Sequence, residues 1–167
     1  MSNSKWPRVG IGYDVHRFAD GRKLMLGGVE IPYHQGLDGH SDADVLLHAI
    51  ADAVLGAAAL GDIGVHFPPS DEQFRGIDSR EILRHAVNLV TKHEWQVINI
   101  DATIIAESPK LMPFADAMRE VIADAAFVTV GDVSVKATTN EGMGFVGRGE
   151  GIAALATVMI APRITEV

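Results

Sequence analysis

The apolar segment at residues 42–59 constrains the fold most, since its length and composition predict a helix with almost no polar surface. Ser41 precedes it as a helix N-cap, and Ser41-x-x-Asp44 has the form of a capping box. Asp44, His48 and Asp52 recur every fourth residue, so they form one polar stripe among apolar neighbours. Burying such groups costs solvation free energy, which a hydrogen-bond partner, an ion pair or a metal must offset.

The rest of the chain alternates strands and helices, without an internal repeat or linker. The pattern βααβαββ predicts the α+β class, a mixed β-sheet packed on one face by helices. The last strand is apolar on both sides, which predicts that both of its faces are covered. The expected strands are residues 8–18, 97–106, 133–139 and 152–160, with a hairpin or short strand at 24–31 and helices from 78 and at 113–126.

The strand at residues 97–106 shows an alternating pattern. Ile98, Ile100 and Ile104 are expected on one face of the sheet, and Asn99 and Asp101 on the other. Ala102 falls with these isoleucines, and Thr103 falls with the polar residues.

Composition narrows the classes of function. The 167 residues carry a formal net charge of −8, which argues against nucleic acid or an anionic membrane as the main partner. The absence of cysteine excludes disulfides and thiolate metal sites, so a metal would need His and carboxylate ligands. No apolar run is long enough to span a bilayer and no signal peptide is evident, so the expected location is the cytoplasm. We expect one domain across residues 1–167, with 1–6 as a flexible tail.

Asp14 and His16 can converge on one ion, because residues two apart on a strand point to the same face. With His48 they would form a site with three protein ligands and an open position, the usual form of a catalytic zinc. The same ligands also suit non-haem iron. His48 alone could equally be a core histidine with satisfied hydrogen bonds.

Two further segments are candidates for phosphate and sugar binding. The strand ending at Thr139 leads to Glu141 and a glycine-dense stretch, whose backbone N–H groups and hydroxyls suit an anion. Glu141 could hold a hard divalent ion of the Mg²⁺ type. Residues 61–64 predict a tight turn that offers the Asp62 carboxylate to a sugar hydroxyl. Their plain alternatives are a glycine-rich β-turn and a helix C-cap.

Several long motifs occur in an order that resembles one enzyme family, the 2-C-methyl-D-erythritol 2,4-cyclodiphosphate synthases of the non-mevalonate isoprenoid pathway. The resemblance covers almost the whole chain from Arg8 to Ile160. The motifs are 12–16 (GYDVH), 40–49 (HSDADVLLHA), 56–64 (GAAALGDIG), 104–110 (IIAESPK), 135–141 (VKATTNE) and 147–151 (GRGEG).

The resemblance implies an activity and its cofactors. The substrate would be 4-diphosphocytidyl-2-C-methyl-D-erythritol 2-phosphate, cyclised to 2-C-methyl-D-erythritol 2,4-cyclodiphosphate with release of CMP, a phosphorus–oxygen lyase reaction. Asp14, His16 and His48 would hold zinc, and Glu141 would help to hold Mg²⁺ or Mn²⁺. His40 and Thr139 match catalytic positions that stabilise the transition state.

The resemblance also implies substrate contacts and a homotrimer with active sites at subunit interfaces, so that the cytidine loop of one chain serves the zinc of its neighbour. Phe145 and Arg148 lie beside the substrate or line a cavity on the threefold axis that can hold an isoprenoid diphosphate. The expected substrate-binding residues are Asp14, His16, His40, Ser41, Asp62, Ile63, Gly64, Phe67, Asp71, Ala106, Pro109, Lys110, Met112, Thr138, Thr139, Glu141, Phe145 and Arg148.

Three alternatives remain open at this point. A zinc-dependent phosphodiesterase or phosphatase acting on a nucleotide would use the same metal and phosphate residues. A non-haem iron oxygenase would use the same ligand set, and a non-enzymatic trimer would bind isoprenoid diphosphate only.

Overall fold

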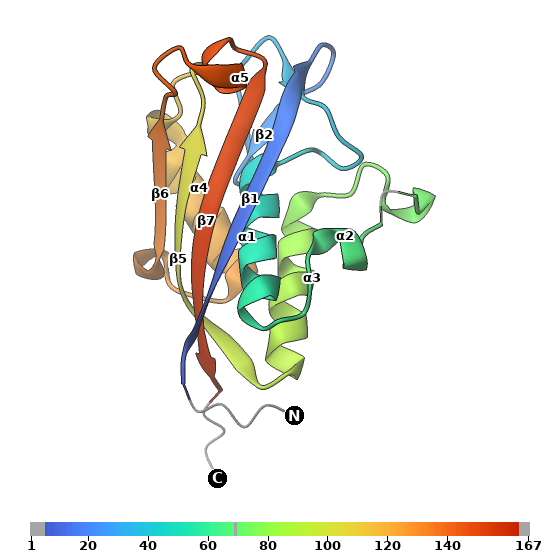
Figure 1. Cartoon of the computed structure of the whole chain (residues 1–167), viewed down its shortest axis with the longest axis vertical. Coiled ribbons are helices and arrows are strands. Elements are labelled where there is room, and N and C mark those ends of the chain that lie inside the picture. Colours follow the sequence, from blue (N-terminus) through green and yellow to red (C-terminus); the bar gives the residue numbers. More distant parts are fainter. Residues whose placement is uncertain (1–5, 69, 164–167) are drawn as a thin grey trace.

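A computed structural model describes residues 6–68 and 70–163 (Figure 1). The tail expected at residues 1–6 lies outside the described residues apart from Trp6, which is exposed. The elements are β1 (Arg8–Ala19), β2 (Leu24–Leu26), β3 (Val29–Ile31), β4 (Gly36–Leu37), α1 (Val45–Ala57), α2 (Ile63–His66), α3 (Ser79–Lys92), β5 (Trp95–Ile105), α4 (Ala115–Ala126), β6 (Val133–Thr138), α5 (Gly144–Gly147) and β7 (Gly151–Pro162), with 3-10 turns at Glu72–Phe74, Met112–Phe114 and Val130–Asp132.

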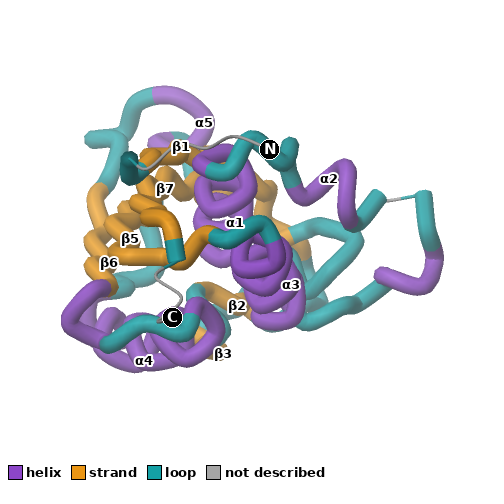
Figure 2. Tube along the Cα trace, turned by 90° about the horizontal axis from the view of Figure 1, so that it is seen from below, coloured by secondary structure: helices purple, strands orange, loops and turns teal. Residues whose placement is uncertain are grey.

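A five-stranded mixed sheet in the order β4-β1-β7-β5-β6 forms one layer. Its pairs are antiparallel except β5–β6, which is parallel. Helices α1, α3 and α4 lie together on one face of the sheet (Figures 1 and 2). The predicted α+β class, mixed sheet and one-sided helical layer are therefore confirmed, as is the hairpin of β2 and β3.

Helix α1 is the centre of the core, and almost all of its side chains are buried. It packs directly on β1 because Gly10 and Gly12 have no side chain there: a Cβ on Gly12 would lie 1.9 Å from the carbonyl oxygen of Ala49. The prediction of Ser41 as N-cap is wrong. Asp44 caps the helix by accepting the Leu47 N–H at 3.0 Å, since the left-handed backbone of the residue before it, φ +59°, keeps the helix from starting earlier.

The predicted facing of β5 is wrong at its start. The register against β7 shifts between Val97 and Asn99, and this irregularity turns Ile98 to the outer face, where it is 37% exposed. Beyond it the expected alternation holds, with Ile100 and Ile104 buried.

The sheet face opposite the helices is apolar over β1 and much of β7, where no other described element covers it, and polar over β5 and β6. On β1 it presents Val9, Ile11 and Tyr13, of which Ile11 is 68% exposed, and on β7 it presents Leu155 and Met159. The expectation that both faces of β7 are covered is therefore met on the face that packs against the helices. On the other face Leu155 and Met159 are exposed in the single chain.

Three short elements were not expected: β4, α2 and α5. Their length explains this, because a few residues carry no readable periodicity. The predicted tight turn at residues 61–64 instead begins α2, with Asp62 as its N-cap. In the described residues, no helix is both long and apolar enough to cross a membrane.

Candidate metal centre

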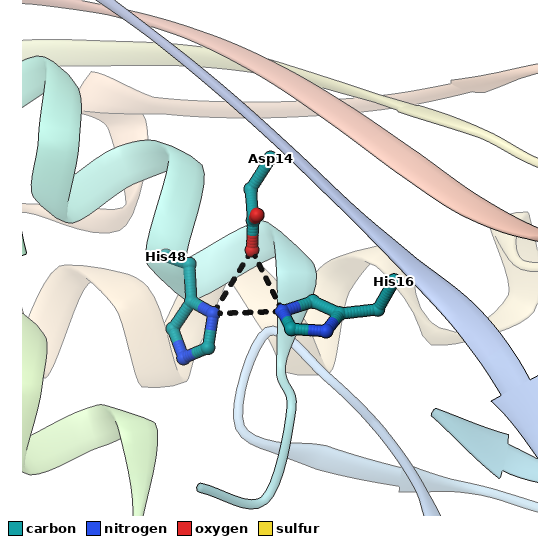
Figure 3. A group of neighbouring side chains, drawn as sticks. All are labelled: Asp14, His16 and His48. Atoms are coloured by element: carbon teal, nitrogen blue, oxygen red, sulfur yellow. Dashed lines mark hydrogen bonds and ion pairs between the residues drawn. The ribbon is translucent and has the colours of Figure 1, made fainter. Parts of the chain in front are cut away.

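Asp14, His16 and His48 meet at one point between β1 and α1 (Figure 3). The Asp14 Oδ2 atom lies 3.0 Å from Nε2 of His16 and 2.9 Å from Nδ1 of His48, and the two nitrogens are 3.2 Å apart. Strand β1 supplies two ligands at period two and α1 supplies the third. The predicted convergence of these three residues is confirmed.

The outward nitrogen of each imidazole has its own partner. His16 donates from Nδ1 to the carbonyl oxygen of Asp38 at 2.6 Å, so Nε2 is the nitrogen that is available to a metal. His48 turns Nε2 to the hydroxyls of Ser41 and Ser79, at 3.1 and 2.9 Å. Such outer partners fix the ring orientation of a metal ligand.

The pKa values of Asp14 and His16 depend on each other. Burial alone would raise the pKa of Asp14, but hydrogen bonds to His16 and His48 outweigh it and hold that pKa well below its ordinary value. Burial alone would lower the pKa of His16, but its hydrogen bond to Asp14 outweighs this and raises the pKa. A metal bound here would compete with protons for the same nitrogen and oxygen atoms.

The three ligand atoms fit a divalent transition metal. Two imidazole nitrogens and one carboxylate oxygen face one another across 2.9–3.2 Å. Tetrahedral ligands at zinc bond lengths would be separated by about 3.3 Å. Among the described residues this is the one group of His and carboxylate side chains placed to hold a metal. The donor set also suits other divalent transition metals.

The other two residues of the polar stripe, Asp44 and Asp52, bind backbone N–H groups and do not join the metal cluster. Asp44 is fully buried and accepts the N–H groups of Gly27 and Gly28 at 2.9 and 2.6 Å, in addition to capping the helix. Burial raises the Asp44 pKa, although these N–H groups oppose the shift. Asp52 accepts the N–H of Ile63 at 2.8 Å and so fixes α2 against α1. Burial likewise raises the pKa of Asp52.

A cavity of about 210 Å³ opens over the metal cluster. It brings together eight of the residues predicted to bind metal or substrate and adds three apolar residues that the sequence analysis missed. Those three are core-like in sequence, so no motif marked them. The predicted residues are Asp14, His16, His40, Ser41, His48, Ile63, Gly64 and Phe67, and the added ones are Phe74, Ile77 and Ile82. We call this cluster and its cavity the metal half of the site.

Asp62 and Asp71 do not line this cavity. Each caps a short helix: an Asp62 carboxylate oxygen accepts the Val65 N–H at 3.1 Å, and one of Asp71 accepts the Gln73 N–H at 3.1 Å. Their predicted contacts with substrate stay predictions.

The other predicted residues form a second group, the phosphate half, made of the loop 106–112 and the turn 138–142. Glu107 connects its two parts, since one carboxylate oxygen accepts the N–H groups of Asn140 at 2.8 Å and Gly142 at 3.3 Å. The Thr139 hydroxyl donates to the Glu141 carboxylate at 3.1 Å. None of this half lines the cavity over the metal cluster, and Lys110, Thr139 and Glu141 are exposed.

Phe145 and Arg148 follow the phosphate half, on α5 and just after it. Phe145 is partly exposed, and Arg148 donates from Nε to the Glu150 carboxylate at 2.6 Å. Neither side chain lines the cavity of the metal half.

Comparison with known proteins agrees with the fold and with the family resemblance of the sequence. The YgbB family matches residues 7–161. A 2-C-methyl-D-erythritol 2,4-cyclodiphosphate synthase of Geobacter metallireducens is 58% identical over 93% of this chain and 99% of its own length, and one from Moorella thermoacetica is 59% identical over 93% and 96%.

Solved structures give the same result. The bifunctional IspDF of Campylobacter jejuni superposes with a TM-score of 0.91 and 44% identity over 95% of this chain, which spans 43% of the length of that protein. IspF of Plasmodium falciparum, in a CDP complex, superposes with a TM-score of 0.84 and 30% identity over 97% of this chain and all of its own.

The fold and the site define an α+β domain with a three-residue cluster suited to a metal ion, and the synthase names of its relatives identify it as an enzyme. The chain belongs to the YgbB family, that of the 2-C-methyl-D-erythritol 2,4-cyclodiphosphate synthases.

Proposed function

We propose that the protein converts 4-diphosphocytidyl-2-C-methyl-D-erythritol 2-phosphate to 2-C-methyl-D-erythritol 2,4-cyclodiphosphate in isoprenoid precursor synthesis. An oxygen of the 2-phosphate attacks the β-phosphorus of the diphosphate. The bond from that phosphorus to the bridging oxygen breaks, and CMP leaves with the oxygen and the electron pair. The substrate carries its own nucleophile, so the protein supplies positioning and charge stabilisation.

The Asp14–His16–His48 cluster beneath a cavity is the observation that carries this proposal. These residues would hold zinc, which when bound supplies a Lewis acid for a phosphate oxygen. The protein's own groups form the rest of the pocket. His40, Ile63, Gly64 and Phe67 line the cavity. His40 would donate a hydrogen bond to a phosphate oxygen, the backbone at Ile63 and Gly64 would contact the erythritol part, and Phe67 would exclude water.

The phosphate half would bind the nucleotide end. The loop 106–112 would hold cytosine, Thr139 would donate its hydroxyl to a phosphate oxygen, and Lys110 would balance phosphate charge. Glu141 would hold Mg²⁺ or Mn²⁺ through one exposed carboxylate, consistent with an ion that keeps most of its water. The CDP complex of the Plasmodium falciparum relative supports a cytidine nucleotide as ligand.

Self-association would bring the two halves together. The outer sheet face presents Ile11, Tyr13 and Leu155 to solvent, an apolar surface that a second copy of the chain can cover. A cyclic homotrimer would place the phosphate half of one chain over the metal half of the next. An isoprenoid diphosphate near Phe145 and Arg148 stays a prediction.

Phosphorus NMR of the purified protein with this substrate and Mg²⁺, before and after zinc removal, tests the function. We expect zinc-dependent formation of a cyclic diphosphate with equimolar CMP. CMP with a linear bisphosphate would instead indicate a hydrolase. If no turnover occurred after zinc was restored, the result would favour the non-enzymatic trimer that only binds isoprenoid diphosphate.

A further inference from the structure

A line of polar side chains leads from the metal cluster into the protein, from His48 through Ser79 to Asp42. The Ser79 side chain is fully buried at the start of α3, and its oxygen lies 2.9 Å from Nε2 of His48. The Ser79 hydroxyl donates to one carboxylate oxygen of Asp42, and the Ser79 N–H donates to the other at 3.1 Å.

The direction of each hydrogen bond follows from the chemistry of the groups. An ionised carboxylate only accepts, so the single hydroxyl proton of Ser79 is directed to Asp42. The oxygen of Ser79 then has lone pairs only for His48, and Nε2 must donate. Ser41 provides a second acceptor for Nε2, with an oxygen that already accepts the Ala43 N–H at 2.9 Å. These two acceptors therefore favour a proton on Nε2 of His48, which frees the Nδ1 lone pair for a metal, whereas in the absence of a metal Asp14 competes for a proton on Nδ1.

We propose that Ser79, oriented by Asp42, is a positioning residue that holds His48 in the tautomer and ring orientation required to bind the metal. This inference rests on the proposed metal site. Without Ser79 the ring would keep one acceptor, Ser41, and the Nε2 proton would be less strongly specified. The proposal also explains why a serine at the first position of α3 is fully buried. The hydroxyl of a serine at the start of a helix is more often exposed to solvent.

A purely structural role predicts different behaviour. The N–H of Ser79 and that of Asp42 tie the segment 41–44 to residues 77–79, because Asp42 also donates to the carbonyl oxygen of Ile77 at 3.2 Å. If this tie were the whole function, losing the hydroxyl would lower thermal stability and leave zinc affinity and the His48 tautomer unchanged.

The test uses Ser79→Ala, Asp42→Asn and a control, Thr91→Ala. Thr91 lies on the same helix, and its hydroxyl donates to the Val87 carbonyl oxygen at 2.8 Å, apart from the metal cluster. Zinc affinity is measured by competition with a chelator, and the His48 tautomer in the zinc-free protein by ¹⁵N NMR of the ring nitrogens. Neither readout needs turnover.

We expect Ser79→Ala to weaken zinc binding about 10–100-fold, as for other outer-shell partners of metal ligands, and to reduce the Nε2–H tautomer. Asp42→Asn, which keeps an acceptor but not the charge, should fall between it and the wild type, and Thr91→Ala should match the wild type. If Ser79→Ala does not fold, Asp42→Asn decides the question.

Wild-type affinity and tautomer in folded Ser79→Ala would overturn the inference, as would equal losses in Ser79→Ala and Thr91→Ala. A wild-type protein that binds no zinc would refute the proposed metal site itself, so the two failures are distinguishable.

Discussion

The metal half and the phosphate half carry residues for one proposed reaction but differ in burial and in the groups that hold them. In the metal half, His48 is only 6% exposed and each histidine has a hydrogen-bond partner outside the cluster, from another segment. In the phosphate half, Thr139 and Glu141 are exposed, and backbone N–H groups bound to Glu107 fix the turn. The contrast agrees with the proposed trimer, in which one chain builds the metal half and a neighbouring chain covers the phosphate half.

The largest effect should follow loss of a metal ligand. We expect His48→Ala to lower kcat/KM about 10³-fold or more, because several kcal/mol of charge stabilisation would be lost. Removing zinc from the wild type should give a similar loss that added zinc reverses, while His48→Ala should not recover. The measurement is CMP release with zinc content determined in parallel. Unchanged turnover in the zinc-free protein would contradict a catalytic role for the Asp14–His16–His48 site.

Mixed trimers would show whether the halves come from different chains. His48→Ala and Glu141→Ala chains are co-expressed with different tags, and trimers carrying both tags are purified. Every mixed cyclic trimer then has one site with an intact metal half and an intact phosphate half, so activity should rise from near zero to about one third of wild type.

The parent proteins, mixed after folding without exchange, serve as the control for this rise. Doubly tagged trimers as inactive as the parents would show that both halves act within one chain. Light scattering of the wild type tests the trimer independently.

The sequence predicted the metal half well because its signals are local. Asp14 and His16 share a strand face at period two, and His48 stands out among apolar residues. Ser79 could not be found in this way, since it meets His48 only through the packing of α3 on α1. The N-cap of α1 was misassigned because Ser41 and Asp44 are equally good caps in sequence, and only the backbone between them decides.

The fold class, sheet and helical layer were also predictable, because long elements have readable periodicity. The facing of Ile98 was not, since an irregularity in strand register leaves no mark in the pattern. In the phosphate half, the loop 106–112 was predicted through resemblance alone, whereas Thr139 and Glu141 were candidates from the residues themselves, with a glycine-rich β-turn as the plain alternative. In the proposed trimer, the relation of this half to the metal half would depend on a contact between chains, which no intrachain pattern encodes.

Glu107 offers a smaller test, confined to the phosphate half. Glu107→Ala removes the acceptor for two backbone N–H groups, so we expect the turn carrying Glu141 to loosen and kcat/KM to fall about tenfold. The Mg²⁺ concentration for half-maximal activity should rise while zinc affinity stays unchanged. Glu107→Gln is the matched control, since one carbonyl oxygen can accept both bonds. Equal activity in the Ala and Gln variants would show that the turn keeps its conformation without the hydrogen bonds to residue 107.

The smallest effect should distinguish two aspartates whose pKa values are lowered for different reasons. Burial opposes the shift at Asp14, where His16 and His48 produce it, whereas at Asp101 an exposed hydrogen bond from Lys136, 2.6 Å away, is the main cause. A lowered pKa in the folded state stabilises the protein above the unfolded value of about 4, and this stabilisation is lost as the pH falls through the folded pKa.

Thermal unfolding of zinc-free Asp14→Asn and Asp101→Asn from pH 7 to pH 3 measures this. Both variants should be less stable than the wild type at pH 7, and both differences should shrink as the pH falls. The difference for Asp101→Asn should be about 1 kcal/mol or less and should nearly disappear in about 1 M NaCl, because solvent and salt screen an exposed pair. The difference for Asp14→Asn should persist in salt, since Asp14 and His16 are half-buried and His48 is buried. Equal salt sensitivity would mean that the Asp14 cluster is as open to water as an exposed ion pair on the sheet, which would remove burial as the property that sets the metal half apart.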